Sequence, residues 1–122
     1  MTVALLYETS EIVDLAAVDL DLTYPSSVSL PGTPDEVNAR ATNLTGLGGA
    51  LFSVSDEPGA STLNIGVVSI GQSIPPGNIA SVRFDCASTP QPGAFGCSFL
   101  ASDTPGNAHS NESFDCTIAV GP

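Results

Sequence analysis

Residues 18–24 read Val-Asp-Leu-Asp-Leu-Thr-Tyr, and a proline follows directly at position 25. Apolar and polar side chains alternate throughout this stretch, which is the pattern of a β-strand with one buried and one solvated face. Residues 80–86 and 114–120 alternate in the same way. No long stretch has the 3.6-residue period of an amphipathic helix. The sequence therefore predicts an all-β chain.

Short apolar stretches recur roughly every ten residues and are separated by turns rich in proline and glycine, a spacing typical of β-sandwiches and barrels. We predict a single domain over residues 1–122, folded as an antiparallel β-sandwich of eight or nine strands. Its strands are expected at residues 2–8, 17–24, 37–42, 51–55, 63–70, 79–86, 95–101 and 112–120, with a loop over 25–34. Its core is expected to contain Val18, Leu20, Leu22, Val82, Phe84, Phe99, Ile118 and Val120.

The charge of the chain excludes several classes of partner. The 122 residues carry a formal net charge of −11, and Arg40 and Arg83 are the two basic residues. Nucleic-acid binding requires clustered lysine and arginine to neutralise phosphates, so it is excluded, and anionic membrane surfaces are disfavoured for the same reason. No apolar run has the ~20 residues needed to span a bilayer. We expect neither nucleic-acid binding nor membrane insertion.

No arrangement of residues predicts catalysis. His109 is the one histidine, and the chain lacks a Gly-x-Ser-x-Gly nucleophile motif and a glycine-rich phosphate loop. We predict a surface position for His109, no enzymatic activity and no cofactor. Calcium, which prefers oxygen ligands, is the alternative left open. Its candidate ligands are the neighbouring carboxylates Asp19 and Asp21, Asp35 and Glu36, and Asp56 and Glu57.

Three cysteines, Cys86, Cys97 and Cys116, lack the close spacing of a zinc site. Each shares a strand register with apolar neighbours, so all three are expected to point inward. We predict a Cys86–Cys97 disulfide across the short crossover between their strands, with Cys116 as the odd thiol. A Cys86–Cys116 bridge is the competing pairing, and three buried free thiols are the remaining alternative.

Exposed aromatic side chains, on which sugars stack, are not expected. The chain has no tryptophan, and five of its seven aromatic residues fall on inward registers. Tyr7 and Phe52 are the two whose register the pattern leaves open. This distribution argues against a polysaccharide-binding platform.

The order of the strand motifs resembles that of a cohesin domain, the receptor module of cellulosome scaffolds. Residues 18–25 resemble the early strand and turn of that family, and residues 63–69 its middle strand. Residues 79–86, 99–107 and 117–120 resemble its later segments. The resemblance implies a nine-stranded jelly roll within a longer secreted protein, located outside the cell or on its surface. It also implies a non-catalytic module that binds a protein partner, either a dockerin-like domain or another surface protein.

In the resembling family one sheet face carries recognition, which the resemblance places on residues 37–42, 63–69 and 80–86. Both arginines fall in this set, so we predict that they contact carboxylates of the partner. The alternative is that they pair with acids of the chain itself. A carbohydrate-binding module and a structural spacer are the alternative functions. The predicted partner-binding residues are Asn38, Arg40, Asn64, Ser81, Arg83 and Asp85.

Overall fold

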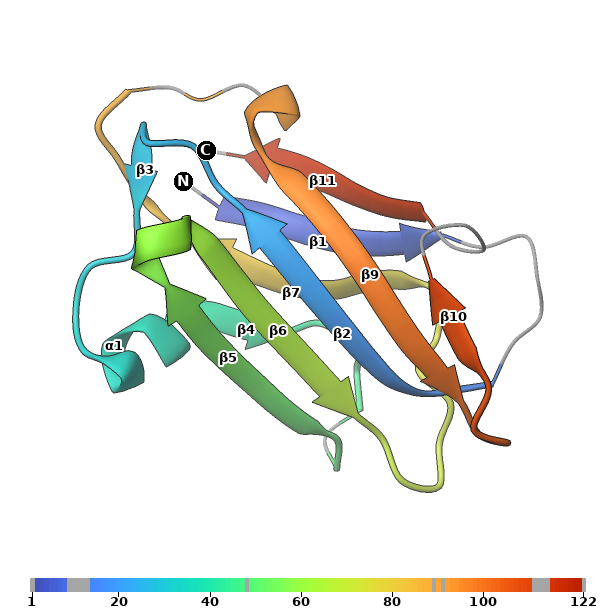
Figure 1. The fold of residues 1–122 in the computed structure, drawn as a ribbon. Helices are drawn as coiled ribbons and strands as arrows, with labels where there is room; N and C mark the ends of the chain where they lie inside the picture. Colours follow the sequence, from blue (N-terminus) through green and yellow to red (C-terminus); the bar gives the residue numbers. More distant parts are fainter. Residues whose placement is uncertain are drawn as a thin grey trace.

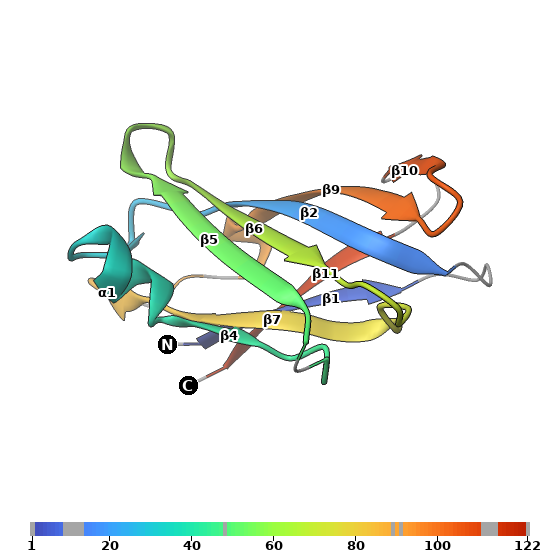
Figure 2. The same ribbon diagram turned by 90° about the horizontal axis from the view of Figure 1, so that it is seen from below.

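The computed structural model describes residues 2–8, 14–47, 49–88, 90, 92–110 and 115–121. Its strands form two large antiparallel sheets that pack face to face (Figures 1 and 2). The predicted antiparallel β-sandwich is therefore confirmed. The strand count differs from the expected eight or nine, because the described residues divide into eleven strands.

The elements have the following bounds along the chain. They are β1 (Thr2–Glu8), β2 (Leu15–Thr23), β3 (Val28–Ser29), α1 (Pro34–Asn38), β4 (Ala41–Asn43), β5 (Leu51–Glu57), the 3-10 turn η1 (Pro58–Ala60), β6 (Thr62–Val68), β7 (Gly77–Arg83), β8 (Asp85–Cys86), the 3-10 turn η2 (Pro92–Ala94), β9 (Gly96–Asp103), β10 (Ala108–Ser110) and β11 (Asp115–Gly121).

Two main sheets account for nine of these strands, and β3 pairs with β8 in a small separate sheet. Sheet A has the strand order β11-β1-β7-β4, and sheet B has the order β10-β9-β2-β6-β5. Strands that are neighbours in a sheet often lie far apart in the sequence: β2 pairs with both β6 and β9. This long-range pairing decides which outward side chains share a surface.

The inward side chains of both sheets form one core. Val18, Leu20 and Leu22 are buried from β2, as their alternation predicts. Across the sandwich, the Tyr7 hydroxyl donates a hydrogen bond to the carbonyl oxygen of Ile74, with an oxygen–oxygen distance of 2.6 Å. Of the remaining predicted core residues, Val82, Phe84 and Phe99 are buried, and Ile118 and Val120 are partly buried against the core.

The strand expected over residues 37–42 is wrong in its first half. The chain forms the one-turn helix α1 there, and β4 begins only at Ala41. Thr33 caps the helix, since its side chain accepts a hydrogen bond from the Glu36 amide while the Glu36 carboxylate accepts one from the Thr33 amide. Pro34 occupies the first turn, where its missing N–H costs nothing.

The strand expected over residues 79–86 also breaks. β7 ends at Arg83, and the chain then leaves sheet A to pair with β3, which lies inside the expected loop over residues 25–34. Phe84 stays buried, but Asp85 and Cys86 are both exposed. The alternation that placed Cys86 inward therefore ends at Phe84.

The predicted Cys86–Cys97 disulfide is wrong, and so is the competing Cys86–Cys116 pairing. Cys86 is a free, exposed cysteine, whereas Cys97 is disulfide-bonded. The physical reason is the break after Phe84, which turns the Cys86 side chain to solvent while Cys97 stays on the inner register of β9. The side chain of Cys116 and all of Phe114 lie outside the described residues.

Candidate functional site

The six residues predicted to bind a partner do not share one surface. Ser81 and Arg83 lie on β7 of sheet A, and Arg40 lies in the turn between α1 and β4. Asn38 ends α1 and is exposed, whereas Asn64 lies on β6 of sheet B. The strands that were expected to share a sheet are thus divided between the two sheets. The role of these residues in binding stays a prediction.

Arg40 forms an ion pair with an acid of the chain itself. Its Nη1 lies 3.0 Å from Oδ1 of Asp85 and also donates a hydrogen bond to the carbonyl oxygen of Arg83. The hydrogen bond from Arg40 holds the pKa of the exposed Asp85 carboxyl below its usual value. For Arg40, the alternative of local pairing is therefore correct.

Asn64 takes part in a different polar cluster, on the outer face of sheet B. Its Nδ2 donates to Oδ1 of Asp19 at 2.6 Å and to Oδ1 of Asp21 at 2.9 Å. Asp21 is the direct cross-strand partner of Asn64, and Asp19 lies two residues earlier on β2. One amide group thus holds two carboxylates on the same face, where both are exposed.

Exposed apolar side chains flank this cluster. Leu51 on β5 and Val68 on β6 are direct cross-strand partners, and they are 67% and 42% exposed. Leu100 on β9 is 54% exposed and lies directly across from Asp19. We call this surface the acidic face; it consists of the outward residues Asp19, Asp21, Leu51, Ser53, Ser55, Asn64, Val68, Ser98 and Leu100.

The acidic face has a definite chemical character. Both arginines of the chain lie outside sheet B, and the chain has no lysine, so no such group neutralises Asp19 and Asp21. The alternation in β2 predicted that both aspartates would face water. It could not predict that Leu100 and Val68 would lie beside them, because β6 and β9 are distant in sequence.

Other kinds of site find little support among the described residues. Their aromatic side chains are all buried or partly buried, including Tyr7 and Phe52, whose register was open. No three His, Cys, Asp or Glu side chains in the described ranges gather closely enough to hold a metal ion. Within those ranges no helix is long and apolar enough to cross a membrane. The backbone of His109 lies in β10, and its side chain is outside the described set.

No protein-family model matches this sequence, and no curated protein matches it. Solved structures do match. A non-cellulosomal cohesin from the hyperthermophilic archaeon Archaeoglobus fulgidus superposes with a TM-score of 0.56 at 13% identity, over 86% of this chain and 72% of that one. The type II cohesin A11 from Bacteroides cellulosolvens gives a TM-score of 0.56 at 14% identity, over 85% and 79%. This chain has a cohesin-like fold.

Proposed function

We propose that this protein is a non-catalytic protein-binding module that docks its partner on the acidic face. The observation that carries the proposal is the combination of exposed Leu51, Val68 and Leu100 with the Asp19–Asn64–Asp21 cluster. Protein interfaces commonly join an apolar centre to polar contacts that fix orientation. An exposed apolar side chain alone is ordinary, but several beside a fixed acidic cluster form a surface suited to a partner.

The chemistry of the face specifies the partner. Unneutralised carboxylates attract a protein that presents lysine or arginine next to apolar side chains. The cohesin-like fold supports a dockerin-like domain, or another surface protein, in that role. An acidic partner would be repelled, because the whole chain carries a net charge of −11.

The same proposal places the protein outside the cell or on its surface, as an adhesion or scaffold module. The disulfide at Cys97 supports this location, since structural disulfides persist in oxidising compartments. A carbohydrate-binding role is weaker, because the described aromatic side chains are all at least partly buried and leave no stacking surface among them. A purely structural spacer would bind nothing at the acidic face.

Affinity capture tests the proposal. The wild-type domain is immobilised beside two variants, Leu100→Arg on the acidic face and Thr42→Arg on the outer face of sheet A. Both positions are exposed and lie on strands, so the two variants introduce the same side chain in similar settings. From an extract of the source organism, we expect a protein that the wild type and Thr42→Arg retain and that Leu100→Arg releases.

Retention of the same proteins by all three forms would contradict the proposal that the partner binds the acidic face. Absence of any retained protein would favour the spacer. Parallel columns of immobilised polysaccharide should not retard the wild type, and retardation there would favour the carbohydrate-binding alternative.

A further inference from the structure

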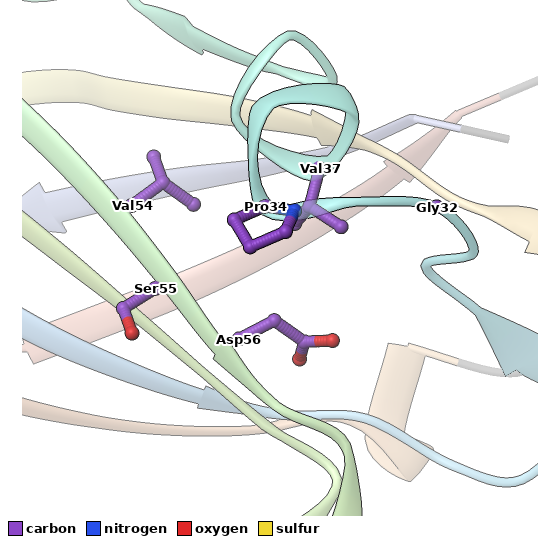
Figure 3. Close-up of a pocket in the computed structure, with 6 residues that line it drawn as sticks. All are labelled: Gly32, Pro34, Val37, Val54, Ser55 and Asp56. Carbon is purple, nitrogen blue, oxygen red and sulfur yellow. The ribbon is translucent and has the colours of Figure 1, made fainter.

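A pocket of about 240 Å³ lies at the edge of sheet B, between β5 and the segment that leads into α1. Val54, Ser55 and Asp56 line it from β5, and Figure 3 shows Pro34 and Val37 facing them. Ser55 belongs to the outward register of β5, so the pocket adjoins the acidic face. A partner lying on that face is within reach of the pocket.

Local sequence fixes the wall opposite β5. Gly32 has a φ of +115°, in the left-handed region that favours glycine. A Cβ at this position would come within 2.8 Å of the Glu36 Cβ and 2.9 Å of its Oε2. The Thr33 capping interaction then holds Glu36 in place. Gly32, Pro34 and Val37 line the pocket on this side, and the Glu36 carboxylate lies beside Gly32.

The charged group that lines the pocket is the carboxylate of Asp56. The Tyr24 hydroxyl donates a hydrogen bond to its Oδ1 at 2.8 Å. Among the described residues no donor reaches its Oδ2. No lysine or arginine lines the pocket, and the nearest along the chain, Arg40, is engaged with Asp85.

We infer that this pocket binds the side chain of a lysine or arginine supplied by the partner protein, an inference that rests on the proposed function. Pro34, Val37 and Val54 form apolar walls along which the methylene stem packs. Asp56 accepts hydrogen bonds from the cationic end, and the Glu36 carboxylate adds a second negative charge near the Gly32 side. The Tyr24 hydrogen bond orients Asp56 before the partner arrives.

The test uses a small probe, so that it needs no identified partner. The ¹⁵N-labelled domain is titrated with Nα-acetyl-L-arginine amide, and the amide shifts are followed by NMR. We expect saturable shifts centred on residues 32–37 and 54–56, with a Kd on the order of millimolar. Nα-acetyl-L-norleucine amide keeps an apolar stem without the charge, and it should bind at least ten times more weakly.

Two variants of equal net charge locate the site. Asp56→Asn keeps an acceptor for Tyr24 but removes the charge, and it should weaken arginine-probe binding at least tenfold. Asp35→Asn removes an exposed acid of α1 that does not line the pocket, and it should bind within twofold of wild type.

Shifts that rise linearly over the whole surface, or equal affinity for the two probes, would overturn the inference. If this titration fails, the proposed role of the acidic face in partner binding still stands, because the capture experiment tests that face separately. Conversely, if the probe binds but affinity capture retains no protein, the proposed function is contradicted, while the ability of the pocket to bind a cationic side chain is confirmed.

Discussion

The two outer faces of the sandwich differ in chemistry although the same alternation builds both. The acidic face of sheet B carries fixed carboxylates and exposed leucine and valine. On the outer face of sheet A, a row across the four strands consists of Ala119, Ala4, Ser81 and Thr42. Among the described side chains of sheet A, Arg83 is the one charged group. Among the described side chains, the face of sheet B therefore combines carboxylates with exposed apolar groups, whereas this row on sheet A holds small side chains.

The two faces indicate which positions of such a fold can carry specificity for a partner. Inward positions must be apolar for the sheets to pack, so they carry little information about a partner. Outward positions are free of that constraint, and their content differs sharply between the two sheets.

The largest expected effect concerns the disulfide at Cys97, which lies on β9 of sheet B. Cys97→Ala should lower the free energy of unfolding by about 3 kcal/mol, since without this disulfide the unfolded chain gains conformational entropy. Urea unfolding measures this loss. The control Cys86→Ala should stay within about 0.5 kcal/mol of wild type, and equal losses would show the assignment to be wrong.

The next-largest expected effect is a fall in the free energy of unfolding at alkaline pH, caused by the buried side chain of Tyr7. Tyr7 of sheet A is buried, and its ring lies 5.6 Å from that of Phe99 in sheet B. Burial raises the pKa of Tyr7 from 10.0 to about 12. Because the folded-state pKa is the higher one, the contribution is complete below pH 10 and is lost as the pH rises through 12. On the order of 2–3 kcal/mol should disappear across this range.

Unfolding at pH 7, 10 and 12 checks the expectation with Tyr7→Phe, which should lose less stability than wild type between pH 10 and 12. At neutral pH the same variant should be destabilised by about 1 kcal/mol, since the Ile74 carbonyl loses its hydrogen bond. Identical alkaline slopes for the two proteins would contradict the role of Tyr7.

A smaller effect compares the faces directly by adding one carboxylate to each. Asn64→Asp places a third acid against Asp19 and Asp21 and removes the amide that links them, so it should destabilise by about 1 kcal/mol. Thr42→Asp lies on β4, two residues from Arg40 and diagonal to Arg83, and should be neutral or slightly stabilising. Thermal unfolding at low salt compares them. Equal destabilisation would mean that the faces do not differ electrostatically.

The smallest effect concerns the Arg40–Asp85 pair at the edge of sheet A. Arg40→Gln should raise the Asp85 pKa toward its ordinary value of 3.8, which a ¹³C carboxyl titration measures. Because the folded-state pKa is the lower one, the pair stabilises above pH 3.8, and this contribution is lost as the pH falls through the folded-state pKa. The difference in free energy of unfolding between wild type and Arg40→Gln should therefore disappear in acid. It should be small at every pH, because solvent and salt screen the exposed pair. If the difference in free energy of unfolding between wild type and Arg40→Gln persists in acid, Arg40 stabilises the fold through packing and not through its ion pair.

Much of the fold could be predicted because alternation is a local signal. Residues 18–24 determine which side chains of β2 face the core, and this register is confirmed from Val18 to Leu22. The helix α1 was missed although its capping sequence, Thr-Pro-Asp-Glu from position 33, is also local. The apolar–polar alternation that follows at residues 37–42 outweighed it in the prediction.

The site could not be predicted in the same way, because it depends on pairing between distant strands. Asn64 was assigned to one face with Arg83, yet β6 joins β2 and β5 in the opposite sheet. Cys86 was placed inward because nothing in its strand pattern reveals that the chain leaves sheet A after Phe84. Register is encoded locally, whereas the neighbours of a strand are decided by the whole chain.

We propose that the partner covers sheet B and not sheet A. Cross-saturation NMR tests it most directly: the captured partner is irradiated, and the saturation transferred to amides of the labelled domain is measured strand by strand. We predict transfer to β2, β5, β6 and β9, strongest around Asp19, Asp21 and Leu100, with little on β1 and β7. Transfer concentrated on β1, β7 and the segment from Arg83 to Asp85 would show that the partner binds sheet A instead.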